Sequence, residues 1–444
     1  MELQNIAYIN YTASGGGAGK ICSTLHSSFE NSIFYNCYEN ERENGIIKID
    51  NFSFRNRFHK IITKFHSYLI NNQISLIPRA TGFILNYFSE PIRRFKVWLG
   101  YEDFCFPATT DSKRFLIKEP TLVHAHNLFP DFFNFRSLEH LSKKYPTLLT
   151  AHDCWLMTGH CAHFFDCERY KSGCGNCPDL SISPSISKDH TKGNLKIKKK
   201  VLNRSNIYLA TPSKWLKQRF LRSQVGDSFR EIRVIANGVN TENFHPITDK
   251  KSLRKKYNLE QNCLIFSFAG NKTKENPWKN FSLMFETLKE LGNKLSQKVI
   301  FLCIGEESEP VSLDPNFKCL FIGHINEISR LNNLYNCSDF YIHFAKADTF
   351  PNTILEAQSC GIPVFANPVC GIPEQIVEGE TGWLLSDNSP QRLAESIKSK
   401  ITSSDYSLVS KNCRNHILEN FSEESMVSNY RQYYKEILAK NLNN

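Results

Sequence analysis

The feature that most constrains the fold is an alternation of short apolar runs with helical patterns. The first run, Ile6–Ile9, leads through a glycine cluster into a helical segment at 18–29. This order is typical of one unit of a parallel α/β sheet. Further strands are predicted at 121–126, 147–151 and 207–211. Strands separated by helices in this way predict a doubly wound sheet, in which ligands bind beyond the carboxyl ends of the strands.

The alternation stops at a turn-rich segment, 235–246, and then starts again. Predicted strands follow at 264–268, 299–304, 339–344 and 363–366, with a helix at 281–291. The last stretch, 421–438, has aromatic and apolar residues at a helical spacing. We therefore expect an α/β protein with two Rossmann-like, doubly wound domains and a C-terminal helix that packs back on the first domain. The predicted parts are 1–230 (with a cysteine-rich insert at 154–178), 231–420 and 421–444.

The composition of the 444 residues agrees with a folded protein. Apolar residues make up 41% of the chain, which is enough for a buried core and excludes wholesale disorder. No run approaches the ~18 apolar residues of a membrane-spanning helix. Residues 1–5 also lack the basic start of a secretory signal. We therefore expect a cytoplasmic protein. The net charge of +10 is modest for this length, so the position of the charges along the chain indicates more about binding partners than their sum does.

The candidate binding residues of the second half of the chain lie mainly in one segment, at the expected start of a helix. Pro351, Asn352 and Thr353 suit a first helical turn. The free N–H groups of such a turn form an anion site that fits a phosphate. Asp348 precedes this turn and Glu356 lies about one turn inside the helix, so two carboxylates flank the site. A structural helix whose acidic start is favoured by the helix dipole would show the same pattern.

This segment resembles the Glu-x7-Glu signature of retaining glycosyltransferases of family 4, which have the GT-B fold of two Rossmann-like domains facing across a cleft. Asp348 stands here in place of the first glutamate. The resemblance covers nearly the whole chain, and each motif alone is weak, but their common order is specific. The motifs are Gly15-Gly16-Gly17, Thr150-Ala151-His152-Asp153, 211–215, 235–239, 361–364, 371–374 and 379–382.

The resemblance implies that the second domain binds a nucleotide-sugar donor. Glu356 matches the glutamate that binds the ribose hydroxyls, and Asp348 matches the residue that faces the donor sugar and takes part in catalysis. Lys279 matches the lysine that steadies the pyrophosphate as it leaves, a step that needs a cation. Backbone amides between Phe350 and Thr353 would contact the sugar and the diphosphate, and Pro351 and Asn352 belong to the same donor-binding stretch.

One phosphate contact of the family is missing. The family often pairs the lysine with an arginine after the preceding strand, but Asn271 follows Gly270 there. Lys272 or Lys274 is the expected substitute. No catalytic divalent metal is implied, because Lys279 and the helix-start amides supply the positive potential.

The glycine cluster of the first domain is expected to lie at the donor site. A P-loop needs Ser or Thr after its lysine, but Ile21 follows Lys20, and the dinucleotide fingerprint needs a third glycine at position 20. What is left is a loop without side chains at Gly16 and Gly17. Donor phosphate and acceptor can approach such a loop closely.

Histidines follow the strands of the first domain. His152 matches the active-site histidine of the family, and we assign it a catalytic role through positioning and electrostatics rather than as a firm general base. His126 and Asp153 are expected on the acceptor side. His124 shares a strand face with His126, but it is expected to pack in the core.

Five of the fifteen cysteines lie between 154 and 177, and four of them form the pattern Cys161-x5-Cys167-x6-Cys174-x2-Cys177. In a reducing compartment such residues are metal ligands or small buried residues rather than disulfides. Cys-x-x-Cys with a turn glycine is typical of half a structural zinc site, and two more thiols complete four ligands. A subgroup of capsule and exopolysaccharide glycosyltransferases resembles this segment. We expect a structural zinc that fixes the loop beside His152, with packed reduced cysteines or a redox role as alternatives.

Residues 51–100 contain eight Lys or Arg against one acid, a net charge of +7. Within 57–65, apolar residues at a helical spacing face away from the cations, which predicts an amphipathic helix. We expect it to rest on an anionic membrane surface, as the N-terminal domains of the family often do. A solvated helix packed on the sheet is the alternative. Nucleic acid is not an expected partner, because no nucleic-acid-binding motif accompanies the charge.

The sequence therefore predicts a retaining glycosyltransferase that moves a sugar, expected to be a hexose, from a nucleotide-sugar donor to a saccharide acceptor. The acceptor is expected to be lipid-linked, in the assembly of a bacterial surface polysaccharide. Three alternatives stay open: a GT-B sugar epimerase or phosphorylase, a zinc-stabilised nucleic-acid-binding protein, and an inactive scaffold. The donor sugar, nucleotide, acceptor and linkage are not resolved, because the contacts that select them are worth only ~1–3 kcal/mol each.

Overall fold

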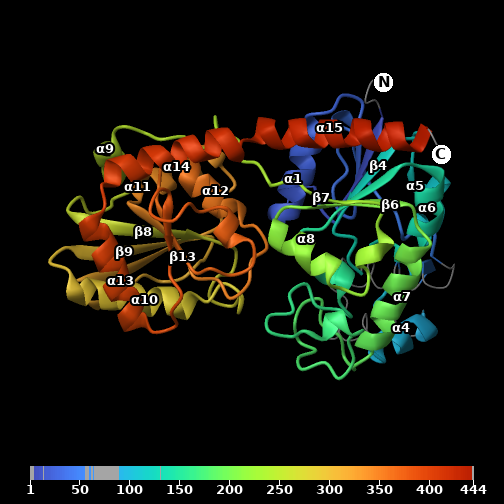
Figure 1. Ribbon diagram of the computed structural model, residues 1–444, viewed down its shortest axis with the longest axis horizontal. Coiled ribbons are helices and arrows are strands. Elements are labelled where there is room, and N and C mark those ends of the chain that lie inside the picture. The colour runs from blue at the N-terminus through green and yellow to red at the C-terminus, as the bar shows by residue number, and fades with distance from the viewer. Residues whose placement is uncertain are drawn as a thin grey trace. The chain divides into compact units, whose positions relative to one another are not determined.

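The computed structural model of the chain describes residues 5–13, 15–55, 60–61, 64, 90–130 and 132–442. The amphipathic helix predicted at 57–65 lies almost entirely outside these residues. The chain forms two compact units, each with its own sheet between helices (Figure 1). The first unit is Met1–Thr211, Leu216–Val234 and Arg431–Asn444, and the second is Pro212–Trp215 and Ile235–Tyr430.

A seven-stranded parallel sheet forms the centre of the first unit. Its four middle strands are buried along their whole length, which explains why they are continuous apolar runs in the sequence. The winding direction reverses between β1 and β4, so the carboxyl edge at this point is where a ligand is expected. In spatial order the strands are β3 (Ile46–Lys48), β2 (Ile33–Asn36), β1 (Ile6–Ile9), β4 (Leu122–His126), β5 (Thr147–Thr150), β6 (Ile207–Thr211) and β7 (Ile232–Val234).

Helices of this part of the chain are labelled in Figure 1. They are α1 (Gly16–Ser27), α4 (Pro91–Trp98), α5 (Ser112–Phe115), α6 (Leu138–Lys144), α7 (Thr191–Asn203) and α8 (Lys214–Leu221). The predicted start of α1 at Ala18 was two residues late, because both Gly16 and Gly17 belong to the first turn. Between β5 and α7 the chain has only short 3-10 turns, and this long loop contains the cysteine cluster.

The second unit is also a sheet covered by helices, but its sheet is mixed. Six of its strands are parallel, and β10 at one edge is antiparallel to β11. The strands in spatial order are β10 (Val311–Asp314), β11 (Phe317–Ile322), β9 (Lys298–Ile304), β8 (Cys263–Ala269), β12 (Phe340–His343), β13 (Val364–Ala366) and β14 (Gly382–Leu384).

Helices cover both faces of this second sheet (Figure 1). On one face lie α10 (Phe281–Lys294) and α13 (Pro390–Ser403), which pack against each other. The other helices are α9 (Lys250–Lys256), α11 (Ile328–Cys337), α12 (Asn352–Ser359) and α14 (Tyr406–Asn420). The core between the layers is rich in phenylalanine, including the stacked rings of Phe266 and Phe340, 5.3 Å apart.

The C-terminal helix α15 (Glu423–Leu442) starts in the second unit and ends in the first. In its second half, the Tyr434 hydroxyl lies 3.3 Å from the hydroxyl of Tyr8 on β1 and 2.7 Å from Nδ1 of His124 on β4. Tyr433 meets the ring of Tyr208 on β6 edge to face. The last turns of α15 therefore pack on the first sheet.

Candidate active site

The loop between β12 and α12 lies at the carboxyl edge of the second sheet and enters the helix through Pro351, its N-cap. Asn237 fixes this entry, because its side-chain amide donates to Asn352 Oδ1 at 2.9 Å and to the Phe350 carbonyl at 3.4 Å. The first N–H groups of a helix have no acceptor within the helix, so the amides of Asn352 and Thr353 are available to an anion. The residues predicted to contact the donor, 350–353, therefore lie together where the loop enters α12.

A glycine allows another segment to pass directly against this loop. A Cβ at Gly371 would lie 2.0 Å from the Thr349 carbonyl oxygen, closer than two non-bonded atoms can approach. The Gly371-Ile372-Pro373-Glu374 motif therefore supports the site loop from behind by close backbone packing.

Asp348 and Lys279 form an ion pair in this site. Lys279 lies just before α10, and its Nζ donates to Asp348 Oδ2 at 2.8 Å. Nε2 of His343, a fully buried residue at the end of β12, lies 3.6 Å from the same oxygen. Burial alone would raise the pKa of Asp348, but Lys279 and His343 together hold it well below its usual range. The structure thus brings together two residues that the sequence assigned to sugar and pyrophosphate.

Glu356 lies inside α12, only 4% exposed, and its Oε2 accepts a hydrogen bond of 2.9 Å from the Tyr335 hydroxyl of α11. Burial raises the pKa of Tyr341 on β12, and the charges of Glu356 and Asp348 add to this shift. Both carboxylates therefore act on the same buried tyrosine. The sequence alone did not indicate Tyr335 or His343, because nothing in the sequence distinguishes them from the other residues of the mainly apolar stretches in which they lie.

The two lysines expected to replace the missing arginine have other partners. Lys274 Nζ lies 2.6 Å from Ser308 Oγ and 3.9 Å from the centre of the Phe321 ring. Lys272 is exposed, and its Nζ lies 3.8 Å from a Glu275 carboxylate oxygen. The replacement of the arginine stays a prediction.

In the first unit, the glycine loop leads from β1 into α1. The Gly15 amide donates to Thr12 Oγ1 at 3.2 Å, and that hydroxyl donates to Glu39 Oε1 at 2.7 Å. Gly16 has φ = 69°, a conformation that favours glycine, and both Gly16 and Gly17 are exposed. The loop thus offers open backbone at the carboxyl end of β1.

His152 follows β5 at the same edge and is partly exposed. Burial lowers its pKa to about 4, so the ring is neutral at pH 7. Its Nε2 lies 2.9 Å from Nδ1 of His126, the last residue of β4. His126 is fully buried and contacts the partly exposed His152, and its place on the acceptor side stays a prediction. His124 packs in the core as expected, between Tyr434 and Thr150.

Asp153 accepts the Trp155 amide at 2.9 Å, and burial raises its pKa to about 7. Behind it lies a buried ion pair that sequence reasoning missed. Lys198 Nζ on α7 lies 3.0 Å from Glu102 Oε2 and donates to the carbonyls of Trp155 (2.8 Å) and Thr158 (3.1 Å). The indole N–H of Trp155 donates to the same carboxylate. This pair therefore anchors the loop that follows His152 and Asp153.

None of the fifteen cysteines, all of them described, forms a disulfide. Burial raises the pKa of Cys161 to about 12 and that of Cys174 to about 11, and neighbouring thiols of the cluster add to both shifts. His160 Nε2 lies 3.4 Å from Cys177 Sγ. Among the residues that the structure describes, no group of three or more His, Cys, Asp or Glu side chains is placed to hold a metal ion. The zinc site therefore stays a prediction.

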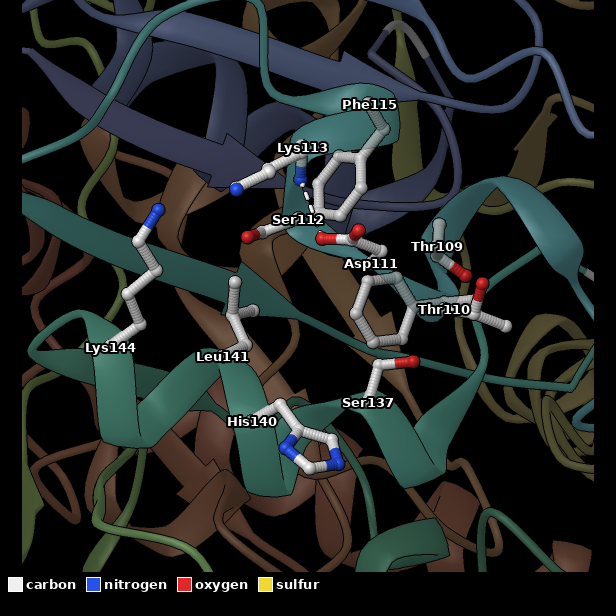
Figure 2. Close-up of a pocket in the computed structure, with 11 residues that line it drawn as sticks. Thr109, Thr110, Asp111, Ser112, Lys113, Phe115, Ser137, His140, Leu141 and Lys144 are labelled. Atoms are coloured by element: carbon white, nitrogen blue, oxygen red, sulfur yellow. Dashed lines mark hydrogen bonds between the residues drawn. The ribbon is translucent and has the colours of Figure 1, made fainter.

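A separate pocket of about 310 Å³ lies in the first unit between α5 and α6 (Figure 2). Lys113 donates its amide to Asp111 at one wall, and Lys144, Leu141 and His140 of α6 form the other. None of the predicted site residues lines this pocket, so we assign it no part in the reaction.

Two family models match the chain. Glycosyltransferase Family 4 matches residues 78–243, and Glycosyl transferases group 1 matches residues 249–416. Among curated relatives, an uncharacterized glycosyltransferase of Methanocaldococcus jannaschii is 26% identical over 54% of this chain and 61% of its own. An Escherichia coli UDP-Gal:alpha-D-GlcNAc-diphosphoundecaprenol alpha-1,3-galactosyltransferase is 26% identical over 47% and 55%. The putative colanic acid biosynthesis glycosyl transferase WcaC of Escherichia coli K12 is 22% identical over 72% and 77%.

Solved structures share the fold of the whole chain. Sucrose-phosphate synthase from Thermosynechococcus elongatus has a TM-score of 0.62 at 16% identity, over 98% of this chain and 100% of that one. Anabaena HepE in complex with UDP and glucose has a TM-score of 0.61 at 14% identity, over 97% and 99%. The chain spans about three fifths or less of the length of the first two curated relatives. With both units matched in order, the chain belongs to the family 4 glycosyltransferases and has their GT-B fold.

Proposed function

We propose that this chain is a retaining glycosyltransferase that moves a sugar from a nucleoside-diphosphate donor to a saccharide acceptor. The observation that carries the proposal is the second-unit site, where Lys279 and the open first turn of α12 offer positive potential beside Asp348 and Glu356. A diphosphate needs such a cation and such amides, and ribose and sugar hydroxyls need carboxylate acceptors. The names of HepE's ligands, UDP and glucose, support a donor of this class.

In this proposal the second unit stabilises the leaving group. The bond between the anomeric carbon and the diphosphate oxygen breaks while the acceptor oxygen attacks the same face, and the leaving phosphate takes the acceptor proton. Lys279 and the α12 amides balance the negative charge that develops on the diphosphate. We expect no catalytic divalent metal, because these groups supply the same positive potential.

His152 would assist from the first unit as a neutral ring. Its low pKa excludes an imidazolium at neutral pH, so it acts by a hydrogen bond to the donor sugar or phosphate. Gly16 and Gly17 would let the donor and acceptor lie close to the backbone.

The acceptor is proposed to be a lipid-linked saccharide in bacterial surface polysaccharide assembly. The names of two Escherichia coli relatives support this, since one is named for a diphosphoundecaprenol-linked GlcNAc acceptor and one for colanic acid biosynthesis. No helix in the described part of the chain has the length and apolar character needed to cross a bilayer.

A docking surface for an anionic membrane is proposed on α4. Ile92, Phe95 and Trp98 are 74%, 50% and 47% exposed along one ridge of this helix. Lys96 is exposed beside them, and Lys188 Nζ lies 3.4 Å from the centre of a Trp98 ring. Apolar side chains beside cations match an anionic lipid surface.

Flotation of the full chain with vesicles tests this surface. Vesicles with 30% phosphatidylglycerol should carry the protein, and purely zwitterionic vesicles should not. Phe95→Ser with Trp98→Ser should abolish flotation, while Leu408→Ser, at a 54% exposed site of the second unit, should not. Equal flotation of all forms would contradict the proposal.

A panel of nucleotide-sugars, measured by thermal shift and by release of nucleoside diphosphate, tests the reaction. Glu356→Gln should lose binding and transfer while the fold survives, because Tyr335 can still donate to the amide oxygen. Glu286→Gln on α10, where the carboxylate is about half exposed, is the matched control. Binding of no nucleotide-sugar, or full activity of Glu356→Gln, would refute the proposal.

A further inference from the structure

The contact between His126 and His152 is an in-plane hydrogen bond between two imidazoles. The nitrogens, Nδ1 of His126 and Nε2 of His152, are 2.9 Å apart, the ring planes differ by 20°, and the centroids are 5.2 Å apart. Rings stacked face to face would have much closer centroids, whereas rings joined edge to edge through one N–H have this spacing. One proton therefore lies between the two nitrogens.

Two arrangements of protons satisfy this bond. Burial lowers the pKa of both rings, so each carries a single proton at neutral pH. In the first arrangement His126 donates from Nδ1, and His152 carries its own proton on Nδ1. In the second, His152 donates from Nε2, and His126 carries its proton on its own Nε2. The surroundings of His126 Nε2 distinguish them.

His126 Nε2 is buried and has no hydrogen-bond partner among the described residues. In the second arrangement it would be an N–H group without an acceptor, which folded proteins rarely bury. In the first arrangement it is only an unused lone pair, which is the less unfavourable of the two. His124, the neighbour on β4, does not change this balance, because both of its nitrogens face hydroxyl groups, of Tyr434 and Thr150.

We propose that His126 holds His152 in the tautomer that carries its proton on Nδ1, so that His152 offers an N–H donor and not a base. Within the described residues Nδ1 of His152 has no hydrogen-bond partner, and the side chain is partly exposed, so this N–H is open to a ligand. That the ligand is an oxygen of the donor sugar or phosphate rests on the proposed function. The tautomer itself does not. His126 is thus a positioning residue that acts through His152.

Long-range 1H–15N correlation spectra of the full chain, labelled with 15N-histidine, test the tautomer. The signals of His152 are identified by their loss in His152→Gln. We expect the pattern of the Nδ1–H tautomer of His152, whose population should exceed that of the Nε2–H tautomer about tenfold or more. His126→Asp offers only an acceptor to Nε2 and should reverse the pattern to Nε2–H. His126→Ala removes the partner and should also shift the population toward Nε2–H, which imidazole prefers in water.

His140→Ala, at an exposed position of the same unit, is the control and should leave the pattern unchanged. An Nε2–H pattern in the unmodified chain would overturn the inference, and this result needs no variant to fold. An unchanged Nδ1–H pattern in folded His126→Asp would overturn it as well. Binding of UDP-glucose is measured in the same samples as a separate test of the proposed function, because the tautomer is observed without ligand.

Discussion

Replacing Lys279 by methionine removes a positive charge from the second-unit site and keeps the length of the side chain. In the structure Nζ lies 2.8 Å from Asp348 Oδ2, and the two side chains are only 21% and 18% exposed. After the substitution, the ring of His343 is the remaining group that stabilises the Asp348 carboxylate, with its Nε2 3.6 Å from Asp348 Oδ2. We expect both stability and transfer to fall.

The size of the stability loss follows from burial. Two unit charges in contact attract by about 4 kcal/mol near a protein surface, and desolvation offsets much of this. Loss of one partner of a fully buried pair costs about 3–5 kcal/mol. Since about a fifth of each side chain is in contact with water, we expect about 2 kcal/mol for Lys279→Met. A double-mutant cycle with Asp348→Asn should give a coupling energy of about 1–2 kcal/mol.

The pH dependence of this loss has a defined sign. The folded pKa of Asp348 is depressed below its usual value near 4, so the pair stabilises the fold above that pH and loses its effect as the pH falls through the folded pKa. The difference between the unmodified chain and Lys279→Met should therefore be full at pH 7 and shrink below about pH 4.

Denaturant unfolding at several pH values measures stability, and release of nucleoside diphosphate measures transfer. Transfer should fall about 10²–10³-fold, the usual effect of losing one group that stabilises transition-state charge. Lys289→Met, at a partly exposed position on α10, should change neither quantity. Strictly additive stability effects would show that the pair does not interact. Wild-type turnover in Lys279→Met would show that this lysine does not stabilise the leaving group.

Three further predictions follow from the first unit. Stability should fall as the pH drops from about 6.5 to 4, by up to about 1.4 kcal/mol per pH unit for each histidine kept neutral by burial, because the unfolded chain binds those protons first. In equilibrium unfolding His124→Gln should reduce this slope, whereas His245→Gln, at an exposed position, should not. The reduced, purified chain should contain one zinc per molecule by elemental analysis and lose it in Cys174→Ser; a metal-free, fully folded chain would refute the zinc site. Lys198→Met should lower the free energy of unfolding by about 3–5 kcal/mol, because the buried Glu102 carboxylate loses its cation. The control Lys200→Met, at an exposed position, should change the free energy of unfolding by no more than about 0.5 kcal/mol. Equal losses in the two variants would contradict a stabilising buried pair.

The strands that sequence reasoning placed best are those buried on both faces. The predicted ranges 6–9 and 207–211 agree with β1 and β6 at both ends, because a covered parallel strand is a continuous apolar run. The strands it missed lie at or next to the sheet edges, and β3 and β7, for example, are only three residues long. Short edge strands have little apolar pattern to detect.

The second-unit site was predictable because its residues lie close together in the sequence or in a motif. Lys279, Asp348 and Glu356 each match a motif residue of the family, so the sequence alone assigns them. The pair of Lys198 and Glu102 was not, because Lys198 belongs to a run of lysines that looks solvated throughout and because topology alone brings two residues 96 positions apart together. The burial of His126 was not predictable for a related reason: strand periodicity gives the face of the sheet to which a side chain points, but not what covers that side chain.

Helix α15 has a consequence for the order in which the protein can be completed during synthesis. Tyr434 contacts Tyr8 and Tyr433 contacts Tyr208, so the first sheet receives part of its cover from residues that are translated after the second unit. The second unit, by contrast, has all of its residues once Tyr430 has been made. Domains commonly fold from the N-terminus as they emerge, but here the first unit can be completed only after all residues of the second unit have been made. Until then, an incompletely covered sheet is exposed to chaperones and proteases.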